Sequence, residues 1–403
     1  MAFYVQVAIQ LLLLAGSIAP TPLYAVYQAA WGFSPITVTI IFAVYAVAVL
    51  AALLVFGSLS DYVGRRPVLI AATALSALTM LLFAHANGVT MLLVARVIQG
   101  LATGSAVAAL GAGLLDLNKA RGTVANSVAP MMGSATGALG ASLMVQYLPA
   151  PTQLVFFVIF VGFVLQAAGV FLMPETAARK PGALASLKPR FGIPMAARRP
   201  FLVAAPALVA VWALIGFYGS LGPALVRLVA HSDSFVLGGL AMFVLAASAA
   251  LTVLVLQRTA PRSLMLLGTT ALLVGVGVSL LATVRGSTVL FLLGTAIAGV
   301  GVGGGFQGAL RTVVPLAAPH ERAGVLSAIF VLCYLAMGLP AVSAGVLTVY
   351  GGGVLMAGRE YGLAVMGLTA LALLGMVWPR RAQPARPAVL TPCPSLRLAG
   401  EAR

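Results

Sequence analysis

An acid and two arginines lie close together between Gly57 and Pro67. The segment reads Gly-Ser-Leu-Ser-Asp-Tyr-Val-Gly-Arg-Arg-Pro. Asp61 precedes Arg65 by four residues, so the carboxylate and the guanidinium can form a charge-assisted pair. Asp61 can also accept hydrogen bonds from the free N–H groups at the start of the following helix. Gly57 allows helices to approach closely, and Gly64 permits a tight turn. These residue types predict a segment that takes part in conformational change, and none of them indicates catalysis.

A second set of polar residues lies in the sequence Arg96-Val97-Ile98-Gln99-Gly100, inside an apolar stretch. At about 1.5 Å per residue, Arg96 lies roughly 10 Å from the nearer end of that stretch. A guanidinium at that depth is costly, so we expect it to face a central cavity or a polar partner. The alternative is an arginine whose long side chain reaches the polar boundary.

The rest of the sequence is strongly apolar. Of its 403 residues, 62% are hydrophobic and 7% are charged, whereas a soluble chain averages about 45–50% apolar and about 25% charged residues. A soluble enzyme is therefore excluded. A transmembrane helix needs about 20 mainly apolar residues, and runs of that length recur along the whole chain. The sequence predicts an all-α polytopic membrane protein with twelve transmembrane helices.

The predicted spans form two groups of six. One long polar connection, at 176–199, separates them, so we predict an N-terminal half at 1–175 and a C-terminal half at 200–378. The tail, 379–403, is rich in Pro and Arg and is expected to be disordered. The spans are expected near 4–28, 37–56, 67–84, 89–115, 123–147, 153–173, 201–226, 235–256, 264–283, 289–310, 323–350 and 361–378.

Basic residues in the short loops predict the orientation, because Lys and Arg are enriched in cytoplasmic loops. Placing both termini in the cytoplasm leaves only Arg227, Arg285 and Arg359 outside. The net charge is +16. Because the basic residues act as topology signals, this charge does not indicate nucleic acid as a partner. We expect a multi-pass protein of a bacterial-type cytoplasmic (inner) membrane. The cytoplasmic loop cations are then Arg65, Arg66, Lys119, Arg121, Arg258, Arg262, Arg311 and Arg322, with those of the central loop and the tail.

An internal repeat supports the division into halves. A shift of 201 residues aligns several glycines and one arginine across matching spans. Two similar six-span halves related by an axis along the membrane normal are a transporter architecture. The aligned residues are Gly100, Gly104, Arg121 and Gly137 with Gly301, Gly305, Arg322 and Gly338.

The loop from Gly57 to Arg66 resembles the signature of the major facilitator superfamily, G-x-L-[SA]-D-x-x-G-R-[RK], in full and at the expected place between spans 2 and 3. The resemblance extends over residues 1–380 and implies two pseudo-symmetric six-helix bundles. It also implies that Asp61, Arg65 and Asp116 form a charge cluster that latches the halves when the cytoplasmic side closes, with Gly57, Gly64 and Arg66 as further residues of this gate. For Asp116, a merely solvated carboxylate at the end of a helix is the alternative.

Two further elements bear on the branch of the family. Arg96 to Gly100 resembles the R-x-x-Q-G pattern of proton-coupled exporters. The fifth span carries Gly133, Gly137 and Gly140, where exporters have G-x-x-x-G-P, but Ala138 replaces the proline. That departure weakens the antiporter assignment, and general helix packing is the alternative for the glycines.

The resemblance places spans 1, 4, 7 and 10 around a central cavity. We therefore expect Gln10, Arg96, Gln99, Tyr218 and Gln307 to contact substrate or take part in coupling, with interhelical hydrogen bonds as the alternative. Trp212 is a weaker candidate, because core packing explains it equally well. His231 and Asp233 can exchange protons or be solvated loop residues.

No sequence feature indicates an enzyme, a cofactor or a metal site. A P-loop, a zinc-binding His pair and a nucleophile elbow are all absent, and Cys333 and Cys393 have no metal-binding spacing. The prediction is a monomeric secondary transporter of small organic molecules, expected to export them in exchange for protons. An importer or uniporter, and a transport-dead receptor or scaffold, are the alternatives. All seven acidic residues lie outside the middle of the spans, so anionic or neutral amphiphilic substrates are favoured over cations.

Overall fold

The structure is a computed structural model that describes residues 1–189, 191–318 and 320–377, and every regular element in these ranges is helical. The first half contains α1 (Ala2–Ile18), α2 (Leu23–Trp31), α3 (Pro35–Phe56), α4 (Ser60–Val63), α5 (Arg65–Ala84), α6 (Val89–Leu117), α7 (Lys119–Tyr147) and α8 (Pro151–Phe171). The remainder contains α9 (Ala183–Ser186), α10 (Met195–Ser220), α11 (Gly222–Val229), α12 (Phe235–Val255), α13 (Pro261–Arg285), α14 (Thr288–Val313), η1 (Val314–Leu316), α15 (Arg322–Tyr350) and α16 (Val354–Val377).

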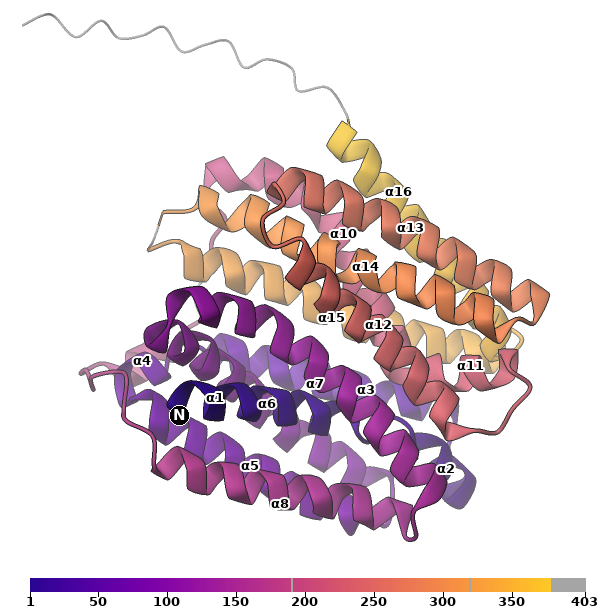
Figure 1. Ribbon diagram of the computed structural model, residues 1–403, viewed down its shortest axis with the longest axis horizontal. Helices are drawn as coiled ribbons and strands as arrows, with labels where there is room; N and C mark the ends of the chain where they lie inside the picture. The colour runs from indigo at the N-terminus through magenta and orange to yellow at the C-terminus, as the bar shows by residue number, and fades with distance from the viewer. Residues whose placement is uncertain (190, 319, 378–403) are drawn as a thin grey trace, which may run out of the picture.

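The predicted fold class is confirmed. Twelve helices of the described chain are long and apolar enough to cross a membrane. In Figure 1 the first six spans and the last six form two bundles that lie side by side. The predicted disorder of the tail at 379–403 concerns residues outside the described ranges.

Spans 1 and 7 are each divided in two. Pro20 and Pro22 indicate the interruption of span 1 in the sequence, whereas the break in span 7 was not predicted. The first breaks between α1 and α2 at Ala19–Pro22, and the second breaks at Leu221, just before Pro223. Proline has no N–H to donate to the carbonyl four residues earlier, so it interrupts the helical ladder. Pro22 and Pro223 are separated by the same 201 residues as the repeat, which means that the halves share this interruption.

Glycines set the close contacts inside each half. A methyl group at Gly133 or Gly137 of α7 would collide with the backbone of α1, and one at Gly216 of α10 would collide with the Met337 carbonyl of α15. Gly140 has open space where a Cβ would lie. The expectation of close packing at Gly140 is therefore wrong in this conformation, because no atom of a neighbouring helix lies within 4 Å of that Cβ position.

The halves meet through two helix pairs, α3 with α15 and α7 with α12. On the first pair, Phe42 and Ala46 pack against Met337 and Ala341. On the second pair, the backbone N–H of Phe235 donates to Gln146 Oε1 at 2.9 Å. These contacts make the interface apolar in the middle of the molecule and hydrogen-bonded toward one end.

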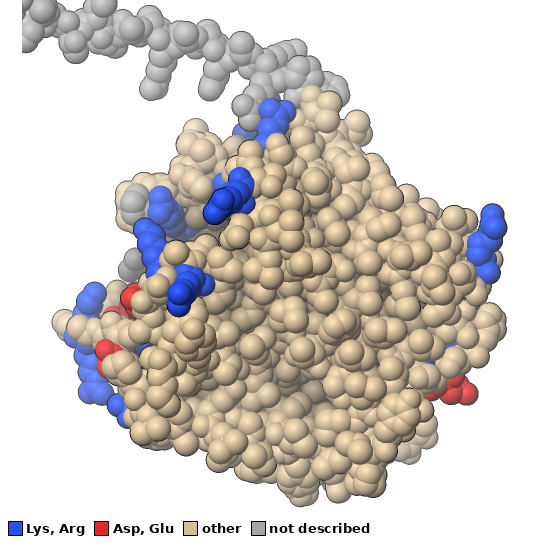
Figure 2. All heavy atoms as spheres, in the orientation of Figure 1, with Lys and Arg blue, Asp and Glu red and all other residues tan. Residues whose placement is uncertain are grey.

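The charged side chains distinguish the two ends of the molecule. Figure 2 shows Lys and Arg gathered at the end that carries α4, on the left of the view, with few charges on the apolar surface between the ends. We call this the basic end and the opposite one the far end. The far end holds α2, α11 and the α7–α8 connection (Figure 1).

Candidate functional site: a charge cluster, a buried arginine and a closed far end

The charge cluster at the basic end is centred on Arg65, the first residue of α5. Its guanidinium pairs with Asp61 at 2.5 Å and with Asp116 of α6 at 3.3 Å, and it donates to Ser60 Oγ at 2.7 Å. The Arg65 side chain is only 10% exposed, whereas its two acidic partners are half-exposed. The structure thus brings together three residues expected to cluster, and it places all three in the N-terminal half.

Glu175 belongs to the same cluster, although the sequence analysis did not select it. Its Oε1 accepts the backbone N–H of Arg65 at 2.8 Å, and its Oε2 accepts that of Arg66 at 3.0 Å. Asp61 was expected to cap the following helix, and that expectation is wrong, because Glu175 occupies the N-terminus of α5. A carboxylate is favourable there because it meets unpaired N–H groups and the positive end of the helix dipole.

The environment of Glu175 favours its charged form. Partial burial raises its pKa, but backbone N–H groups of Ala177, Arg65, Arg66 and Thr176 donate to the carboxylate and together hold the pKa below its ordinary value. Hydrogen bonds to a carboxylate stabilise the ionised state. Glu175 is therefore a fixed negative charge that ties the segment after α8 to the start of α5.

Gly64 makes this arrangement possible. Its φ of +103° is rarely adopted by residues with a side chain. A Cβ there would also approach Glu175 Oε2 to 2.5 Å. Next to it, Arg66 donates to the Phe171 carbonyl and lies over the Phe171 ring at 5.8 Å. At Gly57, which follows α3, a Cβ would collide with the Leu53 carbonyl of that helix.

Arg96 lies in the interior of the N-terminal half, with no exposed surface. Its Nε and Nη2 donate to the Tyr24 hydroxyl at 2.8 and 2.6 Å, and its Nη1 donates to the Ser17 carbonyl at 2.7 Å and to Gln99 Oε1 at 2.6 Å. The guanidinium also lies 5.1 Å from the centre of the Tyr45 ring. Polar partners and aromatic faces surround this cation, and no carboxylate among the described residues pairs with it.

The break in span 1 explains why Arg96 and Gln99 are placed here. Pro20 cannot donate to the Gly16 carbonyl, and Gln99 Nε2 donates to it instead at 2.9 Å. Thr21 donates its backbone N–H to Ile18, which leaves the Ser17 carbonyl for Arg96. The Gly16 and Ser17 carbonyls form the negative end of the α1 dipole. Gln99 and Arg96 of α6 therefore donate the hydrogen bonds that these carbonyls lack because the helix is broken.

The same chemistry joins the two halves at the break in span 7. Pro223 cannot donate to the Gly219 carbonyl, and Thr21 Oγ1 of the other half donates to it at 3.1 Å. Within the described ranges, two hydrogen bonds connect the N-terminal half to α10–α16, this one and the Gln146–Phe235 bond. Both lie at the far end.

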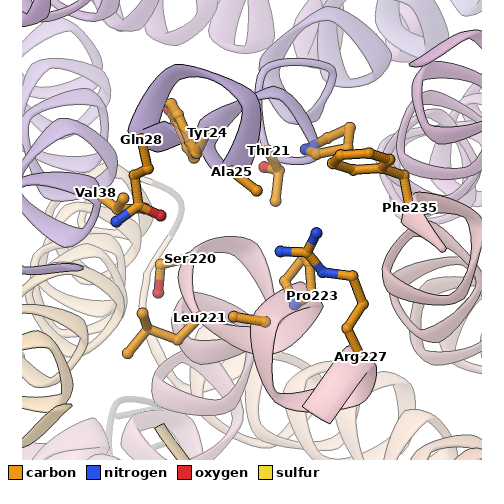
Figure 3. A pocket seen from close by; sticks show the side chains of 12 residues that line it. Thr21, Tyr24, Ala25, Gln28, Val38, Ser220, Leu221, Pro223, Arg227 and Phe235 are labelled. Atoms are coloured by element: carbon orange, nitrogen blue, oxygen red, sulfur yellow. The ribbon is translucent and has the colours of Figure 1, made fainter. Parts of the chain in front are cut away.

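A small cavity of about 30 Å³ remains between the halves at the far end. It lies between α2 and α11, and in Figure 3 the Arg227 guanidinium points into it beside Thr21 and Pro223. Arg227 also covers the Phe235 ring at 5.1 Å. Such a volume holds about one water molecule, so an organic substrate does not fit between the halves at this cavity.

In this conformation, most of the residues expected to contact substrate or take part in coupling are buried. Arg96, Gln99, Gln10 and Tyr218 are all buried, and only Gln307 of the five is half-buried. Tyr218 bonds Thr295 at 2.7 Å inside the C-terminal half, which matches the alternative of an interhelical hydrogen bond. The sequence could not separate a cavity wall from a helix interface, because both are lined by polar residues in apolar spans.

Half-buried aromatic residues gather beside Gln307. Trp212 of α10 lies 5.6 Å from the Phe306 ring of α14 and 4.9 Å from the Tyr334 ring of α15. Its indole N–H is buried and has no partner among the described residues. Trp212 therefore has a stronger claim to contact substrate than the sequence assigned to it.

The whole chain resembles known transporters. The sequence profile described as Major Facilitator Superfamily matches residues 7–342. The chain belongs to this superfamily. No curated protein sequence matches the chain, whereas many solved structures do.

Three of the matching structures are superfamily folds that cover nearly the whole of both chains. The nucleoside transporter NupG, as its D323A mutant, is 12% identical with a TM-score of 0.68, and the match covers 93% of this chain and 99% of that one. NupG itself is 14% identical with a TM-score of 0.65, over 94% and 100%. The human organic anion transporter MFSD10 (TETRAN) is 19% identical with a TM-score of 0.67, over 92% and 98%. At these identities the likeness shows the fold alone.

As a member of the Major Facilitator Superfamily, the chain is a membrane transporter of small molecules. The described residues contain no group of three or more His, Cys, Asp or Glu side chains that could hold a metal ion.

Proposed function

We propose that this chain is a secondary active transporter that exports small organic molecules in exchange for protons. The observation that carries the alternating-access part of the proposal is the asymmetry between its ends. At the far end, Thr21 bonds Gly219 across the halves and little space remains. At the basic end, Arg65 pairs with acidic residues of its own half. This asymmetry fits one state of an alternating-access cycle, in which the halves rock around a midplane site.

Arg65 and its partners are the proposed latch of the opposite state. Asp61 and Asp116 remain half-exposed, so other groups can reach them when the basic ends of the halves approach. Glu175 keeps the N-terminus of α5 in place during that movement. The cluster then changes partners as the basic end closes, while the α5 cap stays intact.

Export and proton coupling are supported by the resemblance of Arg96 to Gly100 to the pattern of proton-coupled exporters. An importer or uniporter of the same superfamily is the second candidate, because no contact in this conformation determines direction. The substrate class proposed is neutral or anionic and amphiphilic. Within the described ranges, the acidic residues lie at or near helix ends, so a cation in mid-span meets no carboxylate.

We further propose that both termini lie in the cytoplasm and that the basic end faces it, as the enrichment of Lys and Arg in cytoplasmic loops predicts. The protein would then reside in a bacterial-type inner membrane as a monomer. In this orientation the far end faces outward, and the structure corresponds to the outward-closed state.

Transport by the purified protein in liposomes tests the proposal. A panel of neutral, anionic and cationic amphiphiles would be loaded, and efflux would be followed with and without an imposed pH gradient. We expect efflux of an anionic or neutral compound to accelerate when the receiving side is acidic. If the pH gradient had no effect on the efflux rate, proton coupling would be excluded. A dication as the best substrate would overturn the proposed substrate class.

A further inference from the structure

A second cavity, of about 490 Å³, lies at the basic end of the C-terminal half. Its walls come from the segment before α10, from the first two turns of α10 and from α15. None of its residues belongs to the charge cluster, the Arg96 network or the far-end contacts. The lining residues on which the argument depends are Phe191, Ile193, Arg198, Phe201, Leu202 and Ala328.

The wall formed by the segment 191–193 is held against two helices. Arg198 Nε donates to the Ile193 carbonyl at 3.2 Å, which fixes the segment to α10. Gly192 packs against α15 so closely that a Cβ at Gly324 would lie 3.1 Å from the Gly192 nitrogen. The cavity is therefore bounded by packed elements of the C-terminal half.

The cavity opens on the side of the molecule that faces lipid. Leu202 is 68% exposed on α10, although it lies inside a membrane span. Ala328 lies two helical turns before Leu335, on the face of α15 that also exposes Leu339. Large apolar side chains exposed on a span contact lipid tails, so an acyl chain can enter beside Leu202 and Ala328.

The cavity has one basic lining residue, Arg198, which is exposed at the start of the span. Arg199, the next residue, and Lys188 in the preceding segment are exposed as well. The nearest acidic residue on α15 is Glu321, whose Oε2 accepts the Ala318 N–H at 3.1 Å. Both ion pairs of the described residues use Arg65, so Arg198 forms no ion pair with a described residue.

We propose that this cavity binds an anionic phospholipid. Its phosphate would accept a hydrogen bond from Arg198, and an acyl chain would lie along Phe201, Leu202 and Ala328. A basic pocket at the membrane boundary with an apolar, lipid-facing groove below it matches both parts of such a molecule. The site is separate from the proposed transport path and does not depend on it.

Lipid binding to the purified full chain in a mild non-ionic detergent tests this site. Phosphatidylglycerol, phosphatidylcholine with the same acyl chains, and glycerol phosphate would each be added, with thermal unfolding and native mass spectrometry as readouts. We expect phosphatidylglycerol to raise the melting temperature by several degrees and one molecule to remain bound, with little effect of the other two. An equal shift with phosphatidylcholine, or with glycerol phosphate alone, would overturn the proposal.

Two variants locate the site. Arg198→Gln should lose at least half of the shift caused by phosphatidylglycerol, whereas Arg285→Gln, at an exposed arginine of the far end, should keep all of it. Ala328→Trp, which fills the groove, should prevent retention of the lipid. A full shift in Arg198→Gln would contradict the assignment even if the Ala328 variant fails to fold.

Discussion

Glu175 holds the first turn of α5 by accepting the backbone N–H of Arg65, while the Arg65 side chain reaches the other way to Asp61 and Asp116. One residue thus connects two groups of contacts. The backbone of Arg65 is fixed by an acid that follows α8, and its guanidinium is shared by acids at the ends of α4 and α6. A movement of α5 relative to α6 must change the side-chain contacts, but it can leave the Glu175 cap unchanged.

The first prediction concerns the pH dependence of stability. Because the pKa of Glu175 is lowered in the folded protein, the stabilisation from its charge is present above its unfolded pKa and is lost as pH falls through its folded pKa. Glu175→Gln should lower the melting temperature at neutral pH by a few degrees, since loss of a cap costs about 1 kcal/mol and Glu175 is largely exposed. The difference from wild type should shrink below about pH 4.

Thermal unfolding between pH 3.5 and 7 measures this effect. Glu360→Gln serves as the control, because Glu360 is an exposed acid at the far end. A constant difference between Glu175→Gln and wild type across the pH range would show that the charge of Glu175 is not responsible.

The second prediction concerns Asp61, which pairs with Arg65 at 2.5 Å on a half-exposed surface. Asp61→Asn should lower the transport rate at least tenfold and leave the melting temperature within a few degrees of wild type. The expected reason is that the pair matters for conformational exchange, whereas an exposed ion pair contributes at most about 1 kcal/mol to stability. Initial rates in liposomes, normalised to inserted protein, provide the measurement. Wild-type kinetics in the variant would exclude Asp61 from the latch.

The third prediction concerns the far end. Thr21→Val removes the hydrogen bond to the Gly219 carbonyl that Pro223 leaves unpaired and should shift the population toward opening of that end. A cysteine at Ala25, which lines the small cavity, would report opening through its reaction with a membrane-impermeant maleimide in a background without Cys333 and Cys393. Its labelling rate should rise several-fold.

Thr79→Val is the matched control for this experiment, because the Thr79 hydroxyl bonds only the Leu75 carbonyl of its own helix. Equal labelling rates in wild type and Thr21→Val would mean that the bond between the halves does not hold the far end closed.

Composition and spacing predicted the fold because apolar runs of spanning length leave little choice in a bilayer. The pairing of Arg65 with Asp61 was also predictable, since both belong to one loop signature, and the resemblance to the family added Asp116 at the end of the fourth span. Two features could not be predicted from the sequence. The role of Glu175 depends on the return of the chain after α8 to the start of α5, which no local pattern encodes. The breaks at Pro20–Pro22 and Pro223 were visible as prolines, but which side chains would satisfy the freed carbonyls depended on tertiary packing.

The fourth prediction concerns orientation. The gathering of Lys and Arg at one end (Figure 2) predicts that this end is cytoplasmic, as is the C-terminus after α16. Alkaline phosphatase fused after Arg403 should be inactive in bacterial cells, whereas a green fluorescent protein at the same position should fluoresce. The reverse pattern would invert the proposed topology and assign the closed end to the cytoplasm.

The last prediction concerns Arg96, which faces polar partners in this conformation. Three of its four hydrogen bonds connect α6 to the Ser17 carbonyl at the end of α1 and to Tyr24 of α2, while the fourth stays within α6. Arg96 therefore holds the two parts of the broken first span together. Arg96→Ala would leave the Ser17 carbonyl and the Tyr24 hydroxyl without these donors in a buried site, and should cost about 3 kcal/mol or more. We expect it to abolish transport and to lower the melting temperature clearly, whereas Arg96→Lys should restore both in part, because an ammonium cannot reproduce the planar arrangement of donors.

Tyr24→Phe separates a positioning role from contact with substrate. It leaves the Arg96 cation in place but removes the hydroxyl that accepts two of its bonds. If Arg96 acts by holding α1 and α2, Tyr24→Phe should reduce the maximal transport rate with little change in the half-saturating substrate concentration. The far end should also label faster at Ala25→Cys in that variant. If Arg96 binds an anionic substrate in another state of the cycle, Tyr24→Phe should leave the maximal rate unchanged while Arg96→Lys raises the half-saturating concentration. Wild-type transport by Arg96→Ala would contradict both roles.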